Sequence, residues 1–156
     1  MRLGDCHNFH DFRELARRRL PGPIFNYIDG AADDESTYRR NTVAFADCDL
    51  VPDVLRGVAD IDLSVTVMGQ KLALPVYCSP TALQRLFHHQ GERAVAAAAH
   101  KYGTMFGVSS LGTVSLEEVR RIAPGPQVYQ FYFHKDRGLN RAMLQRAREA
   151  GINVMM

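Results

Sequence analysis

The first part of the chain has the hydrophobic spacing of amphipathic helices. An apolar side chain recurs every few residues at Phe9, Phe12, Leu15, Ala16 and Leu20, and Pro21-Gly22 then ends the pattern. A second apolar run starts after Pro23, which suits a first helical turn, and stops at Gly30. Acidic residues 33–35 follow at a position where a helix dipole favours negative charge. We predict helices over residues 9–20, 23–29 and 33–45, within a helical segment covering residues 1–60.

The hydrophobic period changes to two after Ile61. Apolar residues alternate with polar ones on both sides of Met68-Gly69, at Leu63, Val65, Val67, Leu72 and Leu74. This alternation predicts a β-hairpin over residues 61–73.

From Leu74 onward, short apolar runs alternate with amphipathic helices. The predicted strands cover 74–79, 105–110 and 128–133, the helices that follow them cover 91–102, 115–124 and 136–150, and 152–156 begins a fourth strand. The first strand is predicted to be buried and to stop at Pro80. Strands that alternate with helices form parallel sheets through βαβ crossovers. The pattern leaves two architectures open, half of a (β/α)8 barrel or a small doubly wound sheet.

Two features favour the barrel. The turn after the first strand lacks the G-x-G-x-x-G fingerprint of a dinucleotide-binding start. Polar residues also gather at the carboxyl ends of successive strands, where barrel active sites assemble. We therefore predict an α/β fold, the N-terminal half of a (β/α)8 TIM barrel preceded by helices and a hairpin. Residues 74–156 would hold the first three βα units and the start of strand 4. Half a barrel leaves an open strand edge, so we expect further sequence or a second copy to cover it.

Composition narrows the class of protein. The 156 residues are 46% hydrophobic and 23% charged, and 19 Lys and Arg nearly balance 17 Asp and Glu. The sequence lacks a concentrated basic face, so we do not expect a nucleic-acid partner. The run Arg17-Arg18-Arg19 ends a predicted helix, where positive charge complements the helix dipole.

The sequence favours a reduced, cytoplasmic protein. Cys6, Cys48 and Cys78 are odd in number and lack C-x-x-C spacing, and the N-terminus lacks the apolar stretch of a secretory signal. No apolar run is long enough to span a bilayer, although peripheral attachment to a membrane stays open. His88-His89 has no further ligand at metal-binding spacing, so no metal site is predicted.

The polar residues at the strand ends are the candidate functional groups. They are Pro80, Thr81 and Ala82 after the first strand, Ser109 and Ser110 after the second, and Gln130 and Tyr132 in the third. The N-terminal helices add Tyr27. Hydroxyls, an amide and backbone N–H groups can frame the polar edge of a heteroaromatic ring, but they include no strong base. A glutamine in an apolar strand must find a hydrogen-bond partner, which makes Gln130 the most distinctive of them.

These residues and their spacing resemble one family, the FMN-dependent α-hydroxy-acid dehydrogenases and oxidases, which includes glycolate oxidase, L-lactate dehydrogenase, flavocytochrome b2 and mandelate dehydrogenase. The resemblance runs from about Phe9 to Met156, roughly the first half of a family member. It includes residues 27–35, Asn41, Pro75, 79–82, His88, Gly91-Glu92, 109–113, 130–132 and 135–137.

The resemblance implies a role for each candidate residue. Pro80, Thr81 and Ala82 would line FMN, with backbone groups near N5 of the flavin, the atom that receives the reducing equivalents. Ser109 and Gln130 would hydrogen-bond the pyrimidine edge of the ring. Tyr132 would bind the substrate near its reacting carbon as a catalytic residue, and Tyr27 would bind the substrate carboxylate. Without the resemblance, a tyrosine such as Tyr27 is more often a core residue of a helix.

The implied reaction is oxidation of an L-2-hydroxy acid to a 2-oxo acid. Leu111 stands where some members have an aromatic residue, which favours a lactate-like substrate over glycolate. The family's general-base histidine, carboxylate-binding arginines, flavin-binding lysine and phosphate site would all follow residue 156, since His10, His100 and His134 do not match the required motif. We therefore expect this chain alone to be nearly inactive.

The electron acceptor and the assembly stay open at this point. Oxygen, a quinone or a cytochrome could accept the electrons, and the resemblance implies a homo-oligomer. Two other functions also stay open. One is a non-catalytic half-barrel fragment; the other is a different flavin-dependent barrel enzyme, against which residues 27–35 argue.

Overall fold

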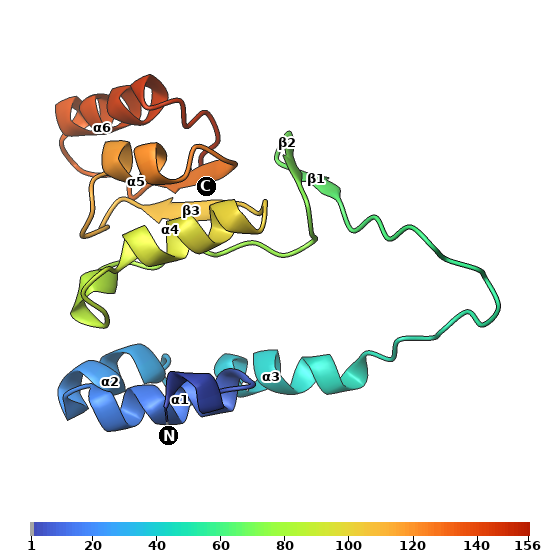
Figure 1. The fold of residues 1–156 in the computed structure, drawn as a ribbon. Helices are drawn as coiled ribbons and strands as arrows, with labels where there is room; N and C mark the ends of the chain where they lie inside the picture. Colours follow the sequence, from blue (N-terminus) through green and yellow to red (C-terminus); the bar gives the residue numbers. More distant parts are fainter. Residues whose placement is uncertain (1) are drawn as a thin grey trace. The chain divides into compact units, whose positions relative to one another are not determined.

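The computed structural model describes residues 2–156 and divides them into two compact units. The first unit ends at Ala59 and the second is Asp60–Met156. Figure 1 shows the order of their elements along the chain. No helix within residues 2–156 combines the length and the apolar character that a membrane span requires.

The first unit consists of short helices. These are α1 (Phe9–Arg19), α2 (Gly22–Asp29), α3 (Ser36–Val43) and two 3-10 helices, Leu3–Asp5 and Ala44–Asp47. The Asn8 side chain caps α1 by accepting a hydrogen bond from Asp11 N, and Arg17, Arg18 and Arg19 occupy its last turn. The three helices predicted from the sequence are confirmed, although α3 begins at Ser36, after the acidic residues, and ends earlier than predicted because its last residues form the 3-10 turn.

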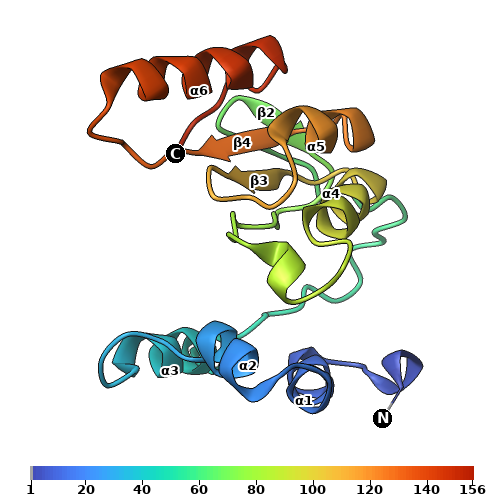
Figure 2. The ribbon, with the colours of Figure 1, turned by 90° about the vertical axis from the view of Figure 1, so that its left-hand side faces the viewer.

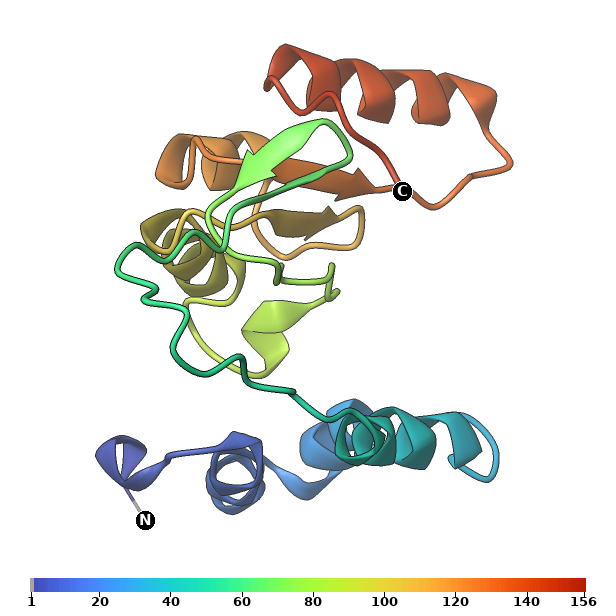
Figure 3. The same ribbon diagram turned by 90° about the vertical axis from the view of Figure 1, so that its right-hand side faces the viewer.

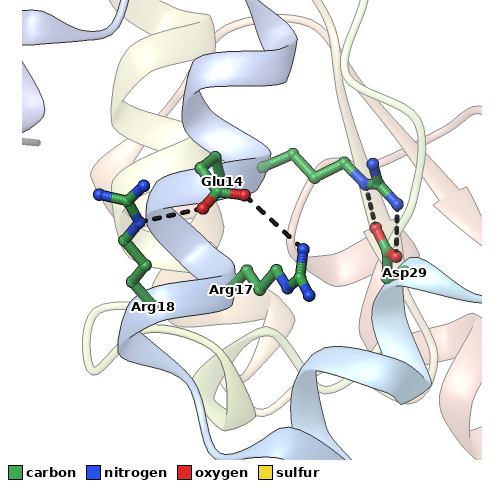
Figure 4. A network of polar contacts seen from close by, with 5 residues as sticks. Glu14, Arg17, Arg18 and Asp29 are labelled. Carbon is green, nitrogen blue, oxygen red and sulfur yellow. Dashed lines mark hydrogen bonds and ion pairs between the residues drawn. The ribbon is translucent and has the colours of Figure 1, made fainter.

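An ion pair joins α1 to α2. The guanidinium of Arg13 donates two hydrogen bonds to the Asp29 carboxylate, at 2.5 Å from Nε and 2.8 Å from Nη2 (Figure 4). Two further arginines, Arg17 and Arg18, face Glu14 on α1 itself. The hydrogen bond from Arg13 lowers the pKa of Asp29 below its ordinary value of 3.8.

We expect Asp29→Asn to lower the melting temperature at neutral pH. A carboxyl whose pKa is lower in the folded state stabilises that state above its unfolded pKa, and this contribution disappears as the pH falls through the folded pKa. The difference in melting temperature between wild type and variant should therefore begin to shrink as the pH falls below about 3.8, and should vanish only below the lowered pKa of the folded state. Asp53→Asn is the control, because Asp53 pairs only with Arg56 three residues away on an exposed segment. A difference that persists in acid would contradict this assignment.

The second unit begins with two short antiparallel strands, β1 (Val65–Val67) and β2 (Gln70–Leu72). Met68 and Gly69 connect them, and both have positive φ angles, 50° and 74°. A two-residue turn with positive φ at both positions matches the twist of paired strands.

A parallel sheet follows. Strands β3 (Phe106–Ser109) and β4 (Gln127–Gln130) pair in parallel, with Ser109 opposite Gln130. Isolated parallel bridges add Cys78 beside Phe106 and Met155 beside Tyr129. The four chain paths thus lie in the order in which they occur in the sequence. Helices α4 (Glu92–Lys101), α5 (Leu116–Ile122) and α6 (Arg137–Glu149) connect them, and a short 3-10 helix, Gln84–Leu86, precedes α4.

The predicted strands 74–79 and 152–156 are wrong in extent, because each is reduced to a single bridge. Cys78 N donates to Met105 O and Gly107 N donates to Cys78 O, but the prolines at 75 and 80 have no N–H to extend this ladder. This path lies at an edge of the described sheet, so Val76 is 62% exposed rather than buried. The predicted third strand was also too long: β4 ends at Gln130, before Tyr132.

The two faces of the sheet have different coverings. The helices of the second unit lie against one face of the sheet (Figure 2), where the core includes Phe106, Val108 and Tyr129. The β1–β2 pair lies over the other face (Figure 3), where Met105, Val128 and Leu72 of β2 form a second cluster. Since side chains alternate along a strand, Gly107, Ser109 and Gln130 share this second face.

A reciprocal amide contact holds the β1–β2 pair against the sheet. Gln70 Nε2 donates to Gln127 O at 2.8 Å, and Gln127 N donates to Gln70 Oε1 at 3.0 Å. The contact lies at the amino end of β4. It is therefore remote from the carboxyl ends of β3 and β4, where the following loops begin.

Candidate functional site

Ser109 and Gln130 form a hydrogen-bonded pair at the carboxyl ends of β3 and β4. Ser109 Oγ donates to Gln130 Oε1 at 3.0 Å and accepts a hydrogen bond from Leu111 N at 3.2 Å. Ser109 is buried and Gln130 is half-buried. With its oxygen occupied by Ser109, the Gln130 amide has an Nε2 donor for which residues 2–156 supply no hydrogen-bond partner. The pair therefore offers a ligand one oriented amide donor.

The turn that contains Pro80, Thr81 and Ala82 lies directly against β3. A Cβ added to Gly107 would lie 2.5 Å from Pro80 Cδ and 2.6 Å from Pro80 N. Leu83 N also donates to Leu111 O at 3.1 Å, which joins this turn to the loop after β3. The Pro80 turn thus lies beside the strand that ends in Ser109, and Ser109 bonds directly to Gln130. Only a glycine at position 107, which has no Cβ, leaves space for such a close approach.

The two candidate tyrosines, Tyr132 and Tyr27, belong to other segments than the Ser109–Gln130 pair and the Pro80 turn. Tyr132 follows β4 in an exposed loop, and its backbone N donates to Ser110 Oγ at 3.4 Å. Tyr27 lies on α2 and is 66% exposed. Because Tyr27 belongs to the first unit and the others to the second, its expected role beside them stays a prediction.

Glu92 is a notable residue of this region to which the sequence analysis gave no role. It begins α4, is only 1% exposed, and accepts hydrogen bonds from Thr113 N at 2.7 Å and Thr113 Oγ1 at 2.6 Å. Burial is the largest single influence and opposes the charge, but the hydrogen bonds from Thr113, from Gln84 N and from its own backbone N–H together lower the pKa of Glu92 below its ordinary value of 4.5. From sequence, an acidic residue in a first helical turn suggests only a favourable dipole interaction, so burial was the missing signal.

No metal centre accompanies these groups within residues 2–156. No set of three or more His, Cys, Asp and Glu side chains gathers there in a ligating arrangement. The rings of His88 and His89 lie 4.4 Å apart, and both residues are exposed. Cys6, Cys48 and Cys78 are free thiols.

A cavity of about 530 Å³ lies in the first unit, between α1 and α2. Its lining includes Arg13 and Asp29, which pair with each other, and Glu14 and Arg17, whose charges lie 4.0 Å apart. Because these charges already pair with one another, they are less available to bind a ligand. The strand-end cluster is therefore the better candidate site.

Comparison with known proteins identifies the family. A family model described as FMN-dependent dehydrogenase matches residues 16–156. The chain belongs to this family. It is 36% identical over 153 residues to glycolate oxidase 1 of Oryza sativa subsp. indica, covering 98% of this chain and 42% of the relative. It is 41% identical over 146 residues to an L-lactate dehydrogenase of Xanthobacter autotrophicus, covering 94% and 38%.

Solved structures give the same assignment. A mandelate oxidase variant containing an FMN adduct superposes with a TM-score of 0.86 at 33% identity, over 94% of this chain and 44% of that one. The chain thus spans about two fifths of the length of the relatives it matches. The resemblance stated from sequence is confirmed, as is FMN as the family's cofactor.

The strand-end residues fit the polar edge of a flavin ring. That edge alternates acceptors with an N–H group, and an amide donor fixed by its neighbour can pair with an acceptor on it. Gln130 Nε2 is such a donor, because Ser109 occupies the amide oxygen. The Pro80 ring lies over Gly107 on the same face of the sheet and supplies an apolar surface beside these polar groups.

Proposed function

We propose that this chain is the N-terminal part of an FMN-dependent enzyme that oxidises an L-2-hydroxy acid to a 2-oxo acid. The observation that supports it best is the Ser109–Gln130 pair, adjacent to the Pro80 turn at the carboxyl ends of neighbouring parallel strands. Family membership supplies the reaction class, and the residues supply a place for the flavin.

We further propose that the sheet is the first half of a (β/α)8 barrel. The paths through Cys78, β3, β4 and Met155 are neighbours in the order of the sequence, without the reversal that defines a doubly wound sheet. Helices α4, α5 and α6 pack against the same face of the sheet, and the carboxyl ends of the strands carry the polar residues, as in a barrel.

FMN, when bound, supplies the acceptor for the two electrons that leave the substrate. Gln130 and Ser109 would then hydrogen-bond the polar edge of the ring, while the turn at Pro80, Thr81 and Ala82 would line the reacting side with backbone groups and little bulk. The hydroxyl of Tyr132 would donate a hydrogen bond to the substrate near its reacting carbon. Tyr27 would bind the substrate carboxylate, which requires fixed donors.

The group that accepts the substrate proton would come from outside this chain. The residues gathered at the strand ends are hydroxyls, an amide and backbone groups, none of which is a base at neutral pH. We therefore expect residues 1–156 alone to be nearly inactive, and the longer protein to be active.

Leu111 would contribute to substrate choice. It is 47% exposed in the loop after Ser109 and its branched side chain leaves space that an aromatic residue would fill. We expect a lactate-like acid to be a better substrate than glycolate.

The proposal is tested by anaerobic mixing of the full-length, FMN-loaded protein with L-lactate, glycolate or L-mandelate. Loss of the visible flavin absorption band, fastest with a lactate-like acid, is the expected result. The chain 1–156, loaded with FMN in the same way, should keep its band. If no 2-hydroxy acid reduces the flavin of the full-length protein, the function is wrong and another flavin-dependent reaction must be considered.

In the full-length protein, Tyr132→Phe is expected to lower kcat/KM for the preferred acid by ~10- to 100-fold, because a hydrogen bond to a developing charge is worth about 1.5–3 kcal/mol. FMN binding should not change. Tyr102→Phe is the matched control, since Tyr102 is exposed after the end of α4. Equal effects of the two substitutions would remove Tyr132 from the substrate site.

A further inference from the structure

Glu92 is a buried carboxylate that accepts hydrogen bonds from two separate segments next to the candidate site. Besides the two bonds from Thr113, Oε1 accepts a hydrogen bond from Gln84 N at 3.4 Å. Gln84 follows the Pro80 turn, and Thr113 lies in the loop after β3. A buried charge is costly unless hydrogen bonds compensate it. Here the compensating donors come from the 3-10 helix that starts at Gln84 and from the loop that contains Thr113.

These bonds continue to the residues proposed to contact the flavin. Gln84 Nε2 donates to Thr81 O at 3.2 Å, and Thr113 Oγ1 accepts from Arg85 N at 3.2 Å. The second loop continues from Thr113 back to Leu111, whose N donates to Ser109 Oγ. A connected set of hydrogen bonds and short chain segments therefore runs from Thr81 through Glu92 to Ser109.

The other anionic side chains of the helices make contacts of a different kind. Glu117 pairs with Arg146 between α5 and α6, and Glu118 pairs with Arg93 between α5 and α4. Each pair joins helix to helix and is partly exposed, so its loss would affect stability without reaching the strand-end loops. Glu92 instead bonds to loops, while Ala96 and Ala99 pack α4 into the core.

We propose that Glu92 is a positioning residue for the flavin site. It holds the loop that contains Thr81 and the loop that follows Ser109 at a fixed separation, so that both present their polar groups to one ring. The proposal rests on the proposed function, because it assumes that FMN binds at these strand ends.

The test compares Glu92→Gln with Glu117→Gln in the full-length protein. Glutamine keeps the size of the side chain but replaces one acceptor oxygen by an NH2 group facing the Thr113 donors. FMN is titrated into each apoprotein and followed by flavin fluorescence and by the visible absorption spectrum of the bound flavin, while thermal unfolding without FMN measures stability. We expect Glu92→Gln to weaken FMN binding ~10-fold or more and to shift the spectrum. Glu117→Gln should leave both unchanged even where it lowers the melting temperature.

Thr113 provides a second pair of variants, which tests the inference even if Glu92→Gln does not fold. Thr113→Val removes the hydroxyl that bridges Glu92 and Arg85 N, whereas Thr113→Ser keeps it. We expect weaker FMN binding with valine and nearly wild-type binding with serine.

The proposed function and the positioning role of Glu92 would be overturned by different results. If the wild-type protein does not bind FMN, the proposed function is overturned, and the inference with it. If the wild type binds FMN and the folded Glu92 and Thr113→Val variants bind it equally well with the same spectrum, the positioning role is overturned while the function stands.

Discussion

Gly107→Ala is expected to lower the free energy of unfolding by about 3 kcal/mol and to weaken FMN binding by ~100-fold. The added Cβ would lie within 2.6 Å of both Cδ and N of Pro80, and neither atom belongs to a flexible side chain. Either β3 or the Pro80 turn must move. Because Gly107 pairs with Val128 in the sheet, the turn has more freedom to shift, and with it the surface proposed to line the flavin.

Gly22→Ala is the matched control for this substitution. Gly22 begins α2, and a Cβ there would meet no atom within 4 Å. We expect it to leave both quantities unchanged or to stabilise the helix slightly. Chemical denaturation and FMN titration of the two variants make the comparison. If Gly107→Ala binds FMN as tightly as Gly22→Ala does, the Pro80 turn is not part of the flavin site.

Gln130→Leu is expected to weaken FMN binding by ~10- to 100-fold. Leucine has a similar volume but removes the Nε2 donor proposed for the ring, and it leaves the buried Ser109 hydroxyl without its acceptor. Leaving one buried partner of a neutral hydrogen bond unpaired costs about 1–3 kcal/mol. The redox potential of any flavin still bound should also change, because the polar edge of the ring takes up charge on reduction.

Gln145→Leu is the control for the loss of an amide. Gln145 is exposed on α6, and its Nε2 donates to Glu149 on the same helix. Its substitution should change neither FMN affinity nor potential. An unchanged affinity and potential in Gln130→Leu would mean that the Ser109–Gln130 pair only stabilises the sheet.

The helices were predicted well because their signals are local. The spacing of Phe9, Phe12 and Leu15, the proline at the start of α2, and the Ser115 cap of α5 each depend on neighbours a few residues away. Ser115 Oγ accepts from Glu118 N, as the sequence Ser-Leu-Glu-Glu suggests. Such features are visible without knowledge of the tertiary structure.

Strand extent was predicted less well, because a strand exists only where a partner lies beside it. Val76 has the apolar character of a buried strand, yet it lies on an edge and is exposed. Pairing at Cys78 and Met155 is restricted to single bridges, at Cys78 because Pro75 and Pro80 lack the N–H group that would extend the ladder. The order of the polar residues at the strand ends could be predicted, since βαβ units direct successive strands the same way.

The contacts within the site could not be predicted from spacing alone. Ser109 and Gln130 are separated by 21 residues, and only the parallel register brings them together. Glu92 was given no role because a glutamate at a helix start is normally exposed, whereas here the loop containing Thr113 covers it. Roles that depend on the arrangement of the two units, that of Tyr27 above all, stay predictions from the family resemblance.

The central claim is that the strand ends at Thr81, Ser109 and Gln130 surround one flavin ring. A crystal structure of the full-length protein with FMN tests it most directly. We predict that Gln130 Nε2 lies about 2.9 Å from an acceptor on the polar edge of the ring, a normal hydrogen-bond distance, with the Pro80 turn against the ring. A flavin bound elsewhere, or a Gln130 amide that makes no contact with it, would contradict the account.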